Sequence, residues 1–235
     1  MKNITAIISL LILYPLSVSA SIELMYNDRV PYMMMNGDEL TGLTGGPVVK
    51  AFEQAGINFN LKKIPTKRQM HVLKENKAKV CAIGWFKKPD REQFAHFSAP
   101  IYRDKPMTAI ANADNDKISS GQAIEHTLSD PNLKLLVKDG FSYGEFIDDK
   151  IKRLNPKTYS TVGSNLQIIK MISSGRADYT FITEEEFISV VKSPQLQKDT
   201  FKVVRFNDMP EGNYRYLLCS FKVEKDTIDR INANL

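Results

Sequence analysis

The chain has 235 residues, of which 43% are hydrophobic and 25% are charged. This composition is that of a folded protein with one large domain or two lobes of about 100 residues each, and it excludes a disordered chain. The formal net charge of +5 is modest and spread along the chain. Nucleic-acid binding requires a concentrated basic face, so we expect no nucleic-acid partner.

The first twenty residues are predicted to be a secretory signal peptide. Lys2 precedes an apolar run from Ile4 to Leu16, and the following residues up to Ala20 suit a cleavage site. An uncleaved membrane anchor is the less favoured alternative, because the apolar run is shorter than the roughly 20 residues that a bilayer span needs. We therefore expect a periplasmic protein that begins at Ser21.

Strands and helices alternate in the first part of the mature chain. Strands are expected over 21–26, 57–64 and 80–83, with a helix that carries Pro47 and ends at Gly56. Thr66 and Gln69 have the spacing of a capping box at the start of a second helix. Arg68 would then lie in the first turn, where free amides attract anions, or it is an ordinary surface residue.

A ligand-facing turn is predicted after strand 80–83. Gly84 would let the backbone approach a ligand closely, and Trp85 and Phe86 offer flat apolar surfaces. Arg91 follows at the start of a short helix, where its guanidinium could hold a carboxylate through two parallel hydrogen bonds. The alternative is a solvated Arg91 among the charged residues of 87–92.

The second part of the chain repeats this alternation. Strands are expected over 108–110, 133–137, 158–162, 179–182, 201–206 and 214–222, with a closing helix over 225–235. Capping boxes are predicted at Ser142, Ser164 and Thr183. The first would place Gly140, Phe141, Ser142 and Tyr143 at a helix start whose free amides can receive an anion.

Several motifs resemble the extracytoplasmic solute-binding proteins of amino-acid ABC importers, family 3. The matching residues are Gly84, Asp90-Arg91, Phe97-Ser98, Pro100-Ile101-Tyr102 and the GRADY sequence of 175–179. The resemblance implies the α/β type II periplasmic binding fold, in which each of two lobes is a mixed sheet flanked by helices. Two hinge strands would join lobe 1, formed by 21–103 and 217–235, to lobe 2, formed by 104–216.

The resemblance also implies roles for individual residues. Arg91 would hold the α-carboxylate of the ligand, Tyr32 would pack on the ligand, and the Gly140–Tyr143 segment would meet it from lobe 2. The family's acidic residue for the α-amino group falls at Thr183 in this chain. Either Glu184 takes the ammonium instead, or the ligand has no ammonium at that place. Glu184 also has a plain structural explanation, since the helix dipole favours acidic residues in the first turn.

The chain contains two cysteines, Cys81 and Cys219, both in predicted strands. The implied fold makes these strands neighbours in lobe 1, and export provides an oxidising compartment. A disulfide between them is therefore one outcome, and two buried free thiols are the other.

Two sequence features favour an enzyme instead. Residues 140–144 form a G-x-S-x-G motif between a strand and a helix, but His71, His96 and His126 all precede Ser142, so the hydrolase order of serine, acid and histidine fails. A few members of the resembled fold are dehydratases or cell-wall lyases, for which Glu184 would be the catalytic acid. No metal-ligand spacing is present, so we expect no metal ion and no cofactor.

We expect a binding protein rather than an enzyme. It would capture a small carboxylate-bearing ligand, an amino acid or a related compound, by closing its lobes. Its partner would be the membrane subunits of an ABC importer or, as the alternative, a signalling receptor. A monomer is the default state for this class.

Overall fold

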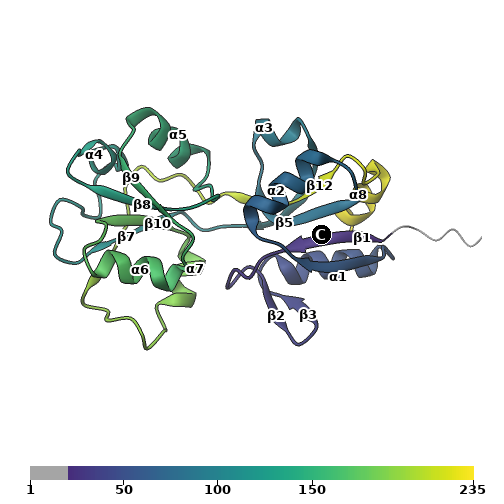
Figure 1. Cartoon of the computed structure of the whole chain (residues 1–235), viewed down its shortest axis with the longest axis horizontal. Helices are drawn as coiled ribbons and strands as arrows, with labels where there is room; N and C mark the ends of the chain where they lie inside the picture. Colours follow the sequence, from purple (N-terminus) through teal and green to yellow (C-terminus); the bar gives the residue numbers. More distant parts are fainter. Residues whose placement is uncertain (1–20) are drawn as a thin grey trace, which may run out of the picture.

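The computed structural model describes residues 21–235, so the predicted signal peptide lies outside the described residues. Two α/β lobes lie side by side and are joined by two extended crossings (Figure 1). The expected fold class, two lobes that are each a sheet flanked by helices, is confirmed. No helix within residues 21–235 is long and apolar enough to cross a membrane.

Lobe 1 contains a five-stranded sheet in the order β4-β1-β5-β12-β6. The central strand β5 is apolar and buried at every residue, as is usual for a strand whose two faces are both covered. Its strands are β1 (Ile22–Tyr26), β4 (Phe59–Lys63), β5 (Val80–Phe86), β6 (Ala95–Arg103) and β12 (Tyr214–Ser220). Helices α1 (Gly45–Gln54), α2 (Thr66–Glu75), α3 (Pro89–Glu92) and α8 (Lys225–Asn232) and the hairpin β2 (Met34–Asn36) and β3 (Glu39–Thr41) complete this lobe.

Lobe 2 contains a second five-stranded sheet in the order β11-β7-β10-β8-β9. Its strands are β7 (Thr108–Asn112), β8 (Lys134–Lys138), β9 (Lys157–Thr161), β10 (Tyr179–Ile182) and β11 (Phe201–Val204). The helices are α4 (Ile124–Ser129), α5 (Glu145–Leu154), α6 (Asn165–Ser173) and α7 (Glu184–Val190). Apolar clusters on both faces of the sheet give this lobe its own core, separate from that of lobe 1.

The two crossings follow β6 and precede β12. These strands pair antiparallel, and Tyr214 of β12 lies opposite Arg103 of β6. The polypeptide therefore leaves the first sheet after Arg103 and returns to it at Tyr214, so the expected boundary at residue 217 lies inside β12.

Three local predictions were wrong. Gly84, Trp85 and Phe86 continue β5 instead of forming a turn, with Gly84 in the left-handed region at a φ of 79°. Thr66 lies inside α2, whose N-cap is Pro65, so no capping box forms there. Ser142 does not cap α5 either, because that helix begins after Gly144.

Asp148 on α5 engages the Ser142 hydroxyl that was expected to cap the helix. Its carboxylate accepts the amide N–H of Tyr143 at 2.9 Å and the hydroxyl of Ser142 at 2.5 Å, so it holds the segment before the helix, and no side chain caps the helix itself. The predicted capping box at Ser164 is confirmed. Thr183 accepts the amide N–H of Glu186 as predicted. The Glu186 carboxylate does not complete the capping box, because it pairs with Arg29 of lobe 1.

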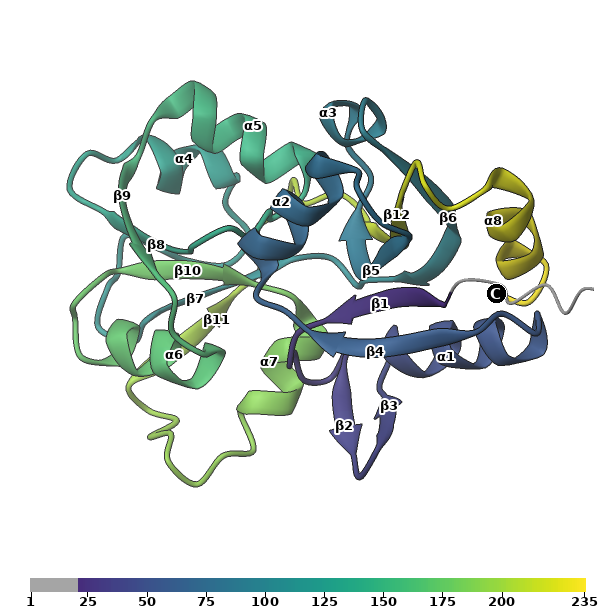
Figure 2. The same cartoon turned by 45° about the vertical axis from the view of Figure 1, so that its right-hand side comes forward.

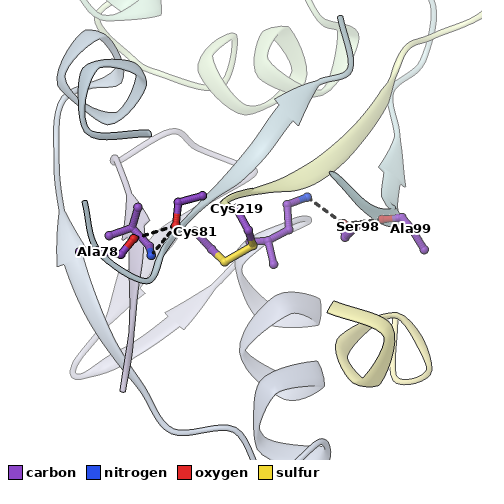
Figure 3. Close-up of a disulfide and its surroundings, with 8 residues drawn as sticks. Ala78, Cys81, Ser98, Ala99 and Cys219 are labelled. Atoms are coloured by element: carbon purple, nitrogen blue, oxygen red, sulfur yellow. Dashed lines mark hydrogen bonds between the residues drawn. A yellow bond between two sulfur atoms is a disulfide. The ribbon is translucent and has the colours of Figure 1, made fainter. Parts of the chain in front are cut away.

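Cys81 and Cys219 are joined by a disulfide in the middle of lobe 1 (Figure 3). They lie directly opposite each other on β5 and β12, which pair antiparallel. The hydroxyl of Ser98 accepts the amide N–H of Leu217 beside this bridge. The bridge therefore links β12, in which the chain returns from lobe 2, to β5 of lobe 1.

Candidate functional site

The candidate site lies between the lobes, where loops from both sheets meet. Strand β1 runs toward lobe 2 and ends beside the start of α7 (Figure 2). Strand β5 supplies Trp85 and Phe86 at its carboxyl end, and lobe 2 supplies the loop of 139–143 after β8. Ligands of α/β folds commonly bind at the carboxyl ends of strands.

An inner cavity of about 40 Å³ lies at this junction. Seven predicted ligand-binding residues line it, four from lobe 1 and three from lobe 2: Gly84, Trp85, Phe86, Arg91, Gly140, Phe141 and Ser142. The structure therefore brings together most of the residues that the sequence singled out. Arg29 and Arg215, which the sequence analysis did not select, also line this cavity.

Arg91 reaches the inner cavity from α3. Its guanidinium carbon lies 4.8 Å from the centroid of the Trp85 ring, and one nitrogen donates to the carbonyl of Phe86 at 2.5 Å. Burial lowers the pKa of Arg91. No carboxylate within residues 21–235 forms an ion pair with it, so most of its five N–H groups are available to an anion.

Arg29 and Glu186 form an ion pair across the cleft. The Nε atom of Arg29 lies 2.9 Å from one carboxylate oxygen and Nη2 lies 3.0 Å from the other, which is the bidentate geometry. The Arg29 guanidinium also lies 4.6 Å from the centroid of the Phe141 ring. Burial alone would raise the pKa of Glu186, but Arg29 outweighs it and the pKa falls to about 2.

Tyr32 is fully buried behind Arg29 and does not line the cavities of the cleft. Its hydroxyl lies 3.0 Å from both the Asp104 carboxylate and the Thr183 hydroxyl, so it joins lobe 1, the first crossing and α7. Burial raises the pKa of Tyr32, which therefore remains a phenol. In this structure Tyr32 connects the two lobes and is not exposed to the cleft cavities.

Arg215 and Asp104 form a second buried ion pair at the hinge. Two guanidinium nitrogens of Arg215 lie 2.7 Å from the two carboxylate oxygens of Asp104, and a third donates to the carbonyl of Gly84 at 3.1 Å. Burial raises the pKa of Asp104, and Arg215 offsets part of that increase. The pair connects β12, the crossing after β6 and the end of β5.

A larger cavity of about 700 Å³ opens from the cleft on the side of α7. Arg29 and Phe141 line both this outer cavity and the inner one. Lys138 lines the outer cavity, with its Nζ atom 4.4 Å from the centroid of the Phe141 ring. Burial and the nearby Arg29 lower the pKa of Lys138. Tyr143 and Thr183 line a third cavity, of about 20 Å³, which Lys138 also borders.

Two predicted site residues lie elsewhere. Arg68 is exposed and borders a groove on the outer surface of lobe 1, because the first turn of α2 directs it away from the cleft. Glu184 faces Arg205, at 3.8 Å, instead of the cavities. Of the three consecutive glutamates, Glu185 and Glu186 are the buried ones.

The residues on which an enzymatic function would depend are not arranged for catalysis in the cleft. The Ser142 hydroxyl donates to Asp148 and accepts the amide N–H of Gly144. No histidine is among the residues that line the cleft cavities. Within residues 21–235, no group of three or more metal-ligating side chains could hold a metal ion.

Comparisons with known proteins agree with this fold. A sequence model of the bacterial extracellular solute-binding proteins, family 3, matches residues 23–232. No curated protein matches the chain.

Similar solved structures include an ancestral arginine-binding protein bound to arginine, with 17% identity, a TM-score of 0.68, and coverage of 91% of this chain and 89% of that one. An amino-acid ABC transporter substrate-binding protein from Streptococcus pneumoniae bound to L-arginine has 15% identity, a TM-score of 0.65 and coverage of 91% and 86%. A structure from Streptococcus mutans, described for glutathione import through GshT and a cystine ABC importer, has 17% identity, a TM-score of 0.68 and the same coverages. These likenesses show a shared fold.

Proposed function

Because the chain belongs to the bacterial extracellular solute-binding proteins of family 3, we propose that it captures a small carboxylate-bearing solute between its lobes and presents it to the membrane subunits of an ABC importer. The observation that carries this proposal is Arg91, a partly buried guanidinium that lines the inner cavity without a carboxylate partner among residues 21–235. A buried cation of this kind is stabilised when an anion binds beside it. The similar solved structures include proteins bound to arginine or to glutamine, which are carboxylate-bearing ligands.

Both lobes would contribute to the bound state. Arg91, Trp85 and Phe86 lie on the lobe 1 side of the inner cavity, and Gly140 and Phe141 lie on the lobe 2 side. A ligand that contacts both sides favours the closed arrangement over an open one. The importer would then recognise the closed protein.

The proposal includes no chemical step on the ligand. Ser142 is held by Asp148, and Glu184 is paired with Arg205 outside the cavities, so neither is placed to act as a nucleophile or an acid toward a ligand in the cleft. We also propose that the chain is exported to the periplasm and acts as a monomer.

A thermal-shift screen of the exported protein tests this function. The compounds are free amino acids, organic acids and short peptides. A bound solute stabilises the protein by about 2.7 kcal/mol at a concentration of 100 times its Kd, which raises the Tm by several degrees. We expect at least one small carboxylate to do so. If no carboxylate raises the Tm, while an assay on ester or peptidoglycan substrates shows turnover, the protein is an enzyme and the proposal fails.

A further inference from the structure

The charged side chains that line the inner cavity are all cationic, and two of them are paired with buried carboxylates, Arg29 with Glu186 and Arg215 with Asp104. Three arginines line it, Arg29, Arg91 and Arg215, and none of its lining residues is an aspartate or a glutamate. A ligand with an ammonium group would need an acceptor or a carboxylate at this place, since burying an unpaired charge is costly. Arg91, which has no carboxylate partner among residues 21–235, therefore favours an anionic group in the inner cavity.

The carboxylates that line the outer cavity already have cationic partners. Glu186 accepts two hydrogen bonds from Arg29 and further ones from Asn165 and Thr183, which uses all four of its lone-pair sites. Asp139 pairs with Lys67 at 2.6 Å, and Asp28 pairs with Lys63. Glu186, the buried carboxylate among them, therefore has no site left for a ligand's ammonium group, whereas Asp139 and Asp28 are solvent-exposed carboxylates at the rim.

The backbone acceptors at the end of β5 are also occupied. The carbonyl of Gly84 accepts from Arg215, and the carbonyl of Phe86 accepts from Arg91. The hydroxyl of Thr183 donates to Glu186 and lies 3.0 Å from the Tyr32 hydroxyl, so it is saturated as well. The other polar side chains that line the inner cavity, such as Asn27 and Thr66, are neutral, so an ammonium group there would find no carboxylate to pair with among residues 21–235.

Two cations that line the cavities lack a carboxylate partner among residues 21–235. Arg91 borders the inner cavity and Lys138 borders the outer one, and Phe141 lies on the boundary of both. Building on the proposed function, we infer that the ligand is a small dicarboxylate without an ammonium group. One carboxylate binds Arg91, the second binds Lys138, and the chain between them passes the Phe141 ring.

The position of Arg29 explains why this chain needs no ammonium on its ligand. The Arg29 guanidinium lies 5.2 Å from the centroid of Tyr32 and 4.6 Å from that of Phe141, and it pairs with Glu186. An internal arginine thus neutralises the buried carboxylate of the cleft. A cationic ligand could reach Glu186 only by displacing Arg29.

Isothermal titration with matched pairs of ligands tests the inference. Succinate is compared with L-aspartate, glutarate with L-glutamate, and adipate with L-2-aminoadipate, so that each pair differs by one ammonium group. We expect one of these dicarboxylates to bind at least tenfold more tightly than its amino counterpart. Lys138→Met should weaken that binding at least tenfold, whereas Lys170→Met, on α6 and hydrogen-bonded to Gln195, should leave it unchanged.

The outcomes separate this inference from the proposed function. Tighter binding of an amino acid than of its ammonium-free partner, or binding of other carboxylates but of none of the dicarboxylates, overturns the inference and leaves solute capture intact. Unchanged binding by Lys138→Met overturns the second contact. Failure of every carboxylate to bind overturns the proposed function itself.

Discussion

Arg29 after β1 and Glu186 on α7 form a bidentate ion pair that spans the two lobes. The exposed fractions of the two side chains are 15% and 5%, so the pair is largely withdrawn from solvent. It places the Arg29 guanidinium beside the Phe141 ring and links the two lobes. The pair therefore affects both the stability of the closed form and the charge that a ligand meets.

Removing one partner of this pair should destabilise the protein more than removing both. Arg29→Met leaves the Glu186 carboxylate buried and unpaired, and such a change costs about 3–5 kcal/mol. Glu186→Gln and the double variant complete a double-mutant cycle, which urea unfolding measures. We expect the double variant to be more stable than Arg29→Met. A cost below about 1 kcal/mol for Arg29→Met would show that the pair is exposed in solution.

Glu186 should contribute to the acid sensitivity of the protein. Its pKa lies at about 2 in the folded state, below its ordinary value of 4.5, so its stabilising contribution is complete above pH 4.5 and is lost as the pH falls toward 2. The full loss is about 3 kcal/mol at 1.36 kcal/mol per pKa unit. Urea unfolding between pH 7 and pH 3 should show a shallower decline for Glu186→Gln than for the wild type. Parallel declines would contradict the low pKa.

The disulfide should stabilise lobe 1 without acting in the site. Its cysteines are 138 residues apart, and closing a loop of this length stabilises a fold by about 4–5 kcal/mol in the chain-entropy treatment. We expect Cys81→Ser with Cys219→Ser to lower the free energy of unfolding by several kcal/mol and to leave ligand affinity within about twofold. Thiol labelling of the unfolded, non-reduced wild type should find no free cysteine, and full labelling would show that the bridge is absent.

The Tyr32 hydroxyl should stabilise the contact between the lobes. Tyr32→Phe keeps the ring beneath Arg215, whose guanidinium carbon lies 3.8 Å from the ring centroid, and removes the contacts to Asp104 and Thr183. We expect a cost of about 1–3 kcal/mol, because buried polar partners lose a hydrogen bond. Small-angle scattering of the free protein should then show a larger radius of gyration. An unchanged radius and unfolding curve would mean that this contact does not hold the lobes together.

Most of the fold could be predicted from local sequence signals. The apolar start of β5, the Gly56 that follows α1 and the capping box at Ser164 each depend on neighbouring residues, and these boundaries lie where they were expected. The predicted cap at Ser142 was wrong, and the spacing of the neighbouring residues could not show this. Asp148, about one turn into α5, accepts the Ser142 hydroxyl and the Tyr143 amide and so holds this segment outside the helix.

The site was predicted less completely because its key pairs are distant in the sequence. Arg29 and Glu186 are 157 residues apart, and Arg215 and Asp104 are 111 apart, so no local pattern links them. Charged Arg215 within the apolar strand 214–222 was the signal available for a buried ion pair. The three glutamates after Thr183 point in different directions around α7, and only packing decides which one faces the cleft.

The central claim is that Arg91 holds the carboxylate of the ligand. Titration calorimetry with a solute found in the screen measures this directly in Arg91→Ala, with Arg68→Ala as the matched control, because Arg68 is an exposed arginine outside the cleft. Loss of a buried charge contact should cost about 2–5 kcal/mol in Arg91→Ala, and Arg68→Ala should bind as the wild type does. Equal affinity of Arg91→Ala and the wild type would contradict the account.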